Sequence, residues 1–96
     1  MGHYRNVAIE TYRNPGEASS ASVRARPLGG QGLSLSMKVE CSRKMRTHYP
    51  VGTVFIVQAQ MTDREGGQPF LYTSWQWPYE VVTRAEAEAR IAKGAL

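Results

Sequence analysis

The sequence predicts a mostly β fold of the α+β kind: a small antiparallel barrel or half-barrel of about five to six strands, SH3-like or OB-like, that ends in a C-terminal helix. Three observations predict it. Short segments alternate apolar and polar residues, turns rich in glycine and proline separate these segments, and a helix-capping signal opens the last one. A short antiparallel sheet covered by the helix is the alternative arrangement.

The length of the chain predicts one domain. Its 96 residues lie near the lower part of the single-domain range, and an apolar fraction of 42% is enough for one core. We expect a single domain over residues 1–96, with an edge strand and loop over 1–20, a β core over 21–82 and a C-terminal helix over 83–95. The segment from Tyr4 to Tyr12 alternates loosely, which is typical of an edge strand. Its exposed edge leaves homodimerisation open.

Two alternating segments form the most regular part of the sequence. Residues 21–26 alternate small apolar and polar side chains, and residues 33–41 place five apolar side chains on one face. Because a glycine-rich stretch lies between them, we expect the two strands to form a hairpin. The apolar sets must face the core together, so the hairpin would gather Arg24, Arg26 and Lys38 on one outer face.

The rest of the chain predicts further strands and two helical segments. Residues 53–62 predict a central strand, apolar on both faces at first and then with Ala59 and Met61 turned inward. A hairpin loop over 63–68 and strands over 70–75 and 79–82 follow. Ser42 is placed to cap one helical turn, and Thr83 with Glu86 forms a capping box. The apolar face of this last helix is mostly alanine, so we expect it to dock weakly.

The positive charge lies in one third of the chain. The net charge is +4, and between residues 22 and 48 six basic side chains stand against a single acid, Glu40. Cations on a sheet face can neutralise phosphates, and neighbouring aromatics can stack bases. The sequence therefore favours a module that binds DNA or RNA, with these candidate residues: Arg24, Arg26, Lys38, Arg43, Lys44, Arg46 and Tyr49.

A protein partner is the alternative ligand. Residues 75–79 are dense in aromatics with polar groups, which are frequent interface anchors. Trp77 adjoins Pro78 in an expected turn, so we expect it to be exposed and assign Trp77 and Tyr79 to partner binding. Which of Trp75 and Trp77 is buried stays open. Charged outer faces also serve solubility alone.

The sequence does not favour catalysis. Cys41 lies on the apolar face of its predicted strand, and no third group is indicated to orient His48 as its base. The glycines of residues 29–32 match neither phosphate-loop pattern. We expect no enzyme activity, no catalytic residue, no metal site and no cofactor.

The same features bear on location. A lone cysteine forms no intrachain disulfide, and the longest apolar run, residues 54–57, is too short to cross a bilayer. We expect a cytoplasmic protein that does not enter the membrane.

Overall fold

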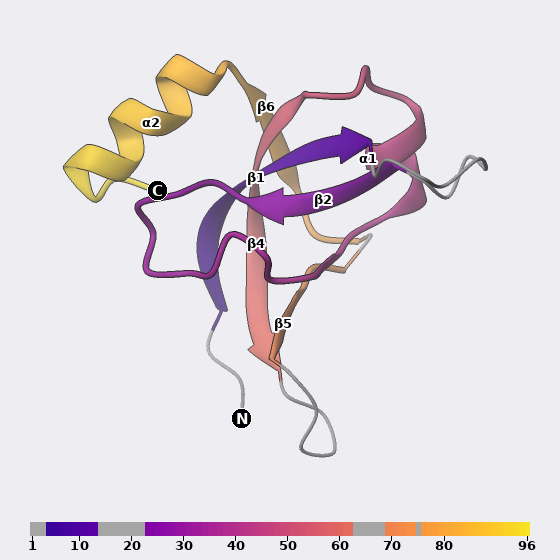
Figure 1. Ribbon diagram of the computed structural model, residues 1–96, viewed down its shortest axis with the longest axis horizontal. Helices are drawn as coiled ribbons and strands as arrows, with labels where there is room; N and C mark the ends of the chain where they lie inside the picture. Colours follow the sequence, from indigo (N-terminus) through magenta and orange to yellow (C-terminus); the bar gives the residue numbers. More distant parts are fainter. Residues whose placement is uncertain (1–3, 14–22, 63–68, 75) are drawn as a thin grey trace.

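The computed structural model describes residues 4–13, 23–62, 69–74 and 76–96, and over them the chain is mostly strand with a C-terminal helix (Figure 1). The predicted loops over 13–20 and 63–68 and the side chain of Trp75 lie wholly or largely outside these residues. The elements in chain order are β1 (Tyr4–Arg13), β2 (Val23–Pro27), β3 (Val39–Glu40), α1 (Arg43–Thr47), β4 (Val54–Thr62), β5 (Phe70–Tyr72), β6 (Tyr79–Val82) and α2 (Arg84–Lys93).

The strands form one sheet that curls into a nearly closed barrel. Its order is β2-β1-β4-β5-β3, and β6 pairs with β4 beside this path. β2 and β3 stand at its two ends and lie near each other without pairing. Around the barrel β4, β1, β2 and β3 therefore follow one another in Greek-key order. Of the two barrel types expected, this partly open Greek-key arrangement fits the OB type. Among the described residues one pair, β3 with β5, is parallel, and the other four pairs are antiparallel, as expected.

β1 lies inside the sheet, which corrects the prediction of an edge strand. It pairs with β4 from Tyr4 to Glu10 and with β2 from Ile9 to Arg13. The alternation is loose because both faces are covered: Val7 and Ile9 point into the barrel, while Ala8 packs beneath α2. Because β2 and β4 pair with β1, the structure does not support the expectation that two copies of the chain could dimerise along an exposed edge of the whole strand.

β2 is confirmed, but the hairpin and the long strand expected after it are wrong. β2 pairs with β1, and β3 has only two residues. The chain between them turns instead: the Ser34 hydroxyl accepts a hydrogen bond from the Ser36 amide, and the Met37 amide donates to the Ser34 carbonyl. Leu35, expected inside, is 59% exposed. Serine side chains compete in this way with strand pairing, which the alternation of residue types does not reveal.

The Gln31 side chain fixes the path of the chain after β2. Its side-chain oxygen accepts from the Ala8 amide, and its side-chain nitrogen donates to the carbonyls of Ala8 and Leu28. The buried side chain therefore takes the place of a paired strand beside β1, and residues 32–38 are left to cross the surface.

The core has two parts, one on each side of the sheet. Phe55 and Leu71 are fully buried in the barrel interior, whereas Val54 and Ile56 pack on the opposite face with Ala87 of α2. This division confirms that β4 is central and apolar on both faces in its first half. Met61, expected inside, is 48% exposed. Within the described residues the pairing of β1 with β4 ends at Gln60, so Met61 lies beyond the described part of β1.

Both predicted helices form and begin at the predicted caps. The Ser42 hydroxyl accepts from the Met45 amide in α1, and the Thr83 hydroxyl accepts from the Glu86 amide in α2. α2 lies across the sheet with Ala87 buried. Its alanine face is supplemented by a bidentate pair between Arg90 and Glu80, at 2.9 and 3.1 Å. Within the described residues no helix is long and apolar enough to span a membrane.

Candidate functional site

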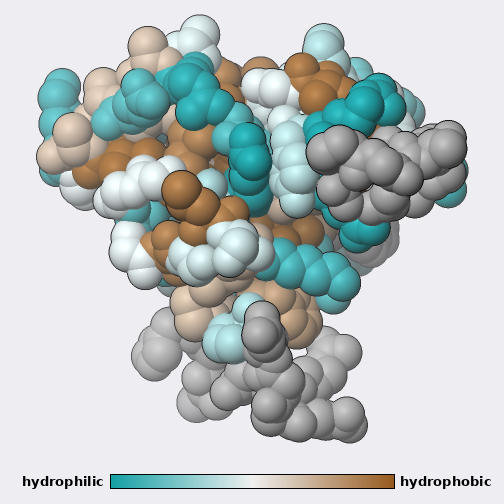
Figure 2. Space-filling view, in the orientation of Figure 1, coloured by the Kyte–Doolittle hydropathy of each residue, from teal (hydrophilic) through white to brown (hydrophobic). Residues whose placement is uncertain are grey.

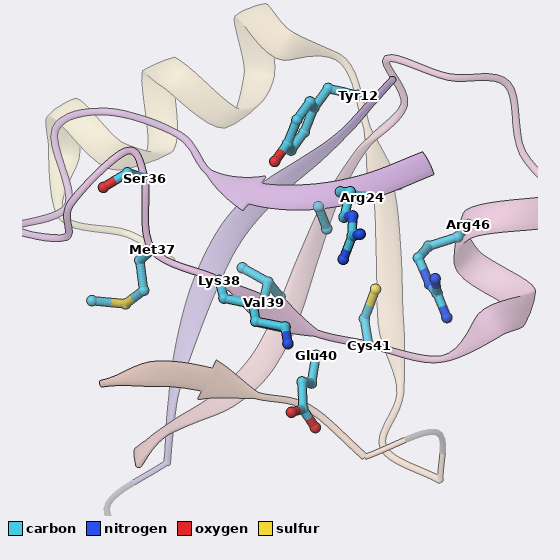
Figure 3. Close-up of a pocket in the computed structure, with 10 residues that line it drawn as sticks. Tyr12, Arg24, Ser36, Met37, Lys38, Val39, Glu40, Cys41 and Arg46 are labelled. Carbon is cyan, nitrogen blue, oxygen red and sulfur yellow. The ribbon is translucent and has the colours of Figure 1, made fainter. Parts of the chain in front are cut away.

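A cleft lies where the barrel fails to close, between β2 and β3 with α1 at one end (Figure 3). We call it the seam cleft. Its volume is about 490 Å³, which is within the usual range of ligand sites. The inward-facing residues Ala25 and Val39, 5% and 7% exposed, form its base. Because β2 and β3 do not pair with each other, the backbone leaves an opening here that side chains line.

Three cations line the seam cleft, and each comes from a different element. Arg24 lies on β2, Lys38 directly precedes β3, and Arg46 lies on α1. Figure 3 shows the three side chains around the gap between β2 and the end of β3. Among the described residues that line the cleft Glu40 is the one acid, so positive charge predominates among them. A concave site lined by one sign of charge concentrates its field on an oppositely charged ligand.

Cys41 lines the same cleft, with its sulfur between Arg24 and Arg46 in Figure 3. Burial raises the pKa of the Cys41 thiol, and the Arg46 guanidinium opposes that rise only in part. The thiolate is the nucleophilic form, so a raised pKa makes this cysteine a weak nucleophile at neutral pH.

Arg26, although predicted as a ligand-binding cation, is engaged elsewhere. Its Nε donates to Glu10 at 3.0 Å, and its guanidinium lies 4.5 Å from the centre of the Tyr12 ring. Arg84 of α2 donates to the other oxygen of Glu10. Glu10 therefore links Arg26 of the sheet to Arg84 of the helix, and Arg26 is engaged in this pair.

Arg43 and Lys44 are exposed on α1 and do not line the seam cleft. They share a short helix with Arg46, and Met45 anchors that helix in the barrel core. Their charges therefore stand at one end of the cleft.

Tyr49 and Tyr79 are less accessible than the predictions required. Each ring makes an edge-to-face contact with Phe55, at 5.2 and 5.5 Å between ring centres. Their hydroxyls lie 3.0 Å apart, and this hydrogen bond raises the pKa of Tyr79. Both rings therefore extend the barrel core, and neither offers a free face in the seam cleft.

Trp77 is half-buried and belongs to a group of aromatic rings that the sequence did not indicate. Its ring centre lies 4.9 Å from that of Tyr4 and 5.7 Å from that of Tyr72, edge to face in both cases. Tyr4 is 61% exposed and Tyr72 is 37% exposed. We call Tyr4, Tyr72 and Trp77 the aromatic patch. Only the strand register brings these rings together, so a local pattern could not have found them.

Other site chemistry receives little support from the described residues. They contain no group of three or more His, Cys, Asp or Glu side chains that could hold a metal ion. On the face seen in Figure 2, hydrophobic residues lie in separate areas with hydrophilic side chains between them. A broad apolar docking surface is therefore not visible on that face.

The fold and the cleft define a class: a small OB-type barrel whose open seam is lined mainly by cations. Comparisons with known proteins add no family to this description, because no family model matches and neither a curated protein nor a solved structure is significantly similar.

Proposed function

We propose that this protein is a non-catalytic module that binds nucleic acid, with the phosphate backbone held in the seam cleft. One observation carries the proposal: Arg24, Lys38 and Arg46 line a single cleft from three separate parts of the chain, and Glu40 is the one acid among the described residues that line it. Side chains of this kind neutralise phosphates and account for much of the affinity of nucleic-acid-binding proteins. Arg43 and Lys44 would add long-range attraction from α1.

The position of the cleft supports the same proposal by analogy of fold. In OB-type barrels the face of the second and third strands binds oligonucleotides and oligosaccharides. The seam cleft lies between β2 and β3 of this chain. Of these two ligand classes, a cation-lined site favours oligonucleotides, because their backbone is negatively charged. Fold alone does not determine function, so the charge of the lining residues carries more weight than the analogy.

The state of Cys41 supports a binding role over a catalytic one. The thiol lines the cleft, and its raised pKa disfavours the thiolate, which is its nucleophilic form. His48, considered as its base, is exposed at the end of α1.

Salt dependence of binding tests the proposal. A labelled thymidine oligonucleotide of about 16 nucleotides, near the upper site size of one OB fold, is titrated with the protein and followed by fluorescence anisotropy. Salt is varied from about 50 to about 200 mM, and duplex DNA and RNA of the same length are compared. We expect affinity to fall steeply with salt. Absence of binding at the lowest salt would contradict the proposal.

Lys38→Gln is the sharpest variant because the Lys38 side chain is exposed at the cleft. Each phosphate contact on a single strand contributes about 0.7 to the slope of log affinity against log salt. We expect this variant to lower the slope by about that amount and to leave thermal unfolding unchanged. Lys93→Gln, the same charge change at the end of α2, is the matched control and should keep the wild-type slope. Equal slopes for both variants would locate the contact outside the seam cleft.

A further inference from the structure

The aromatic patch is continuous with the seam cleft. Strand register pairs Tyr4 of β1 with Gln60 of β4, Gln60 with Tyr72 of β5, and Tyr72 with Glu40 of β3. Directly paired residues lie on the same face of a sheet, so these four form one row across its outer surface. Glu40 also lines the seam cleft, so the row ends at the cations. Neighbouring strands lie about 4.8 Å apart, which places Tyr72 one strand from Glu40 and Tyr4 two strands farther.

Trp77 arranges the patch. It lies between Tyr4 and Tyr72 at interplanar angles of 90° and 82°. Edge-to-face contacts are a favoured geometry for aromatic pairs, so each ring supports the orientation of the next. Tyr4 and Tyr72 remain well exposed within this arrangement, so ring surface is open to solvent beside a site for negative charge.

We propose that the aromatic patch stacks the bases of a single strand whose phosphates lie in the seam cleft; this inference rests on the proposed function. A single-stranded nucleic acid carries flat apolar bases on a negatively charged backbone, and it matches aromatic rings next to cations in both respects. In a duplex the base faces are stacked on each other and cannot reach the rings. The protein therefore prefers single strands over duplexes, and it tolerates different base sequences because every base has a stacking face.

Two probes separate stacking from charge. One is the thymidine oligonucleotide, and the other is an abasic strand of the same length, which keeps the phosphates and lacks the bases. We expect wild-type protein to bind the thymidine strand at least about fivefold more tightly than the abasic strand. Equal affinity for the two strands would overturn the stacking inference and leave the phosphate site standing. Failure to bind either strand would instead overturn the proposed function.

Tyr72→Leu removes a ring and keeps an apolar side chain at this exposed position. We expect it to reduce thymidine-strand affinity toward that of the abasic strand, with abasic binding and the salt slope unchanged. Tyr72→Phe keeps the ring and should retain wild-type preference for the thymidine strand. Retention of that preference by Tyr72→Leu would overturn the inference. So would self-association that Tyr72→Leu abolishes while oligonucleotide binding stays normal, because the patch would then serve a second copy of the chain.

Discussion

The two sides of the barrel use charge in different ways. Beneath and beside α2, arginines meet carboxylates: Arg26 and Arg84 share Glu10, and Arg90 binds Glu80 with two hydrogen bonds. At the seam cleft the lining cations outnumber Glu40, the one acid among the described lining residues. Charge beneath α2 joins elements of the fold, whereas positive charge predominates among the described residues that line the cleft.

This difference teaches that local excess of charge is more informative than net charge. The net charge of +4 is moderate, and part of the basic segment is balanced by Glu10, which lies outside that segment in sequence. An excess of cations around a concave site is costly unless solvent or a ligand offsets it. The comparison therefore predicts that changes beneath α2 alter stability and that changes at the cleft alter binding.

Glu10→Gln should have the largest effect on stability. The Glu10 side chain is only 12% exposed and accepts hydrogen bonds from Arg26 and Arg84. Loss of hydrogen bonds between charged groups should lower the free energy of unfolding by about 2 kcal/mol. For a domain of this size we expect the melting temperature to fall by about 10 °C, measured by circular dichroism.

Two measurements control this prediction. Glu86→Gln removes an exposed carboxylate that is 3.6 Å from Arg90, and its effect should stay within about 0.5 kcal/mol. Oligonucleotide affinity of Glu10→Gln should remain that of the wild type below its melting transition. Weakened binding by a folded Glu10→Gln would break the division between the two sides.

Glu40→Gln should have the opposite profile. It removes a carboxylate that lines the seam cleft, so repulsion of phosphates falls while the cations remain. We expect oligonucleotide affinity to rise about threefold at low salt, with the free energy of unfolding changed by less than about 0.5 kcal/mol.

The control for this variant is Glu88→Gln, an equal charge change on the exposed surface of α2. It should raise affinity less than Glu40→Gln, because its charge is more distant and more screened. Weaker binding of the thymidine strand by Glu40→Gln would mean that Glu40 accepts a hydrogen bond from a base, such as the N3–H of thymine.

Local signals in the sequence predicted the elements that depend on local chemistry. Ser42 and Thr83 cap their helices as expected, because capping involves hydrogen bonds over three or four residues. β6 has the predicted bounds, and β4 begins one residue later than predicted. The barrel with a C-terminal helix follows from the number and spacing of such segments.

Strand pairing could not be predicted in the same way. The position of β1 between β2 and β4 depends on contacts far apart in sequence, and its buried outer face depends on α2 at the other end of the chain. The long strand expected over residues 33–41 does not form, because the Ser34 side chain hydrogen-bonds a nearby backbone amide and the Gln31 side chain hydrogen-bonds the edge of β1. Alternation shows which side chains could share a face, but not which backbone groups are free to pair.

The candidate site likewise depends on contacts between residues far apart in sequence. Arg24 and Lys38 were expected on one hairpin face, and they instead line one cleft across an unpaired seam. Arg26, also expected on that face, forms a salt bridge with Glu10, its directly paired neighbour on β1. The aromatic patch depends on the row through Gln60, so only the registers of β1 with β4 and of β4 with β5 could have revealed it.

The pH dependence of the Glu80–Arg90 pair gives the smallest expected effect. Hydrogen bonds from Arg90 hold the pKa of Glu80 below its ordinary value of 4.5. A carboxylate whose pKa is lower in the folded state binds its proton more weakly there than in the unfolded chain. The pair therefore stabilises the fold above pH 4.5, and this contribution is lost as the pH falls through the lower folded-state pKa.

Glu80→Gln should lower the melting temperature at neutral pH by less than Glu10→Gln does, since the Glu80 side chain is 54% exposed and its pair is screened by solvent. The difference from wild type should shrink on acidification and vanish below the folded-state pKa, measured by thermal unfolding at a series of pH values. A difference that stays constant with pH would show that the pair acts through packing of the Arg90 side chain. A change in oligonucleotide affinity at neutral pH would connect α2 to the seam cleft, against the separation of the two sides.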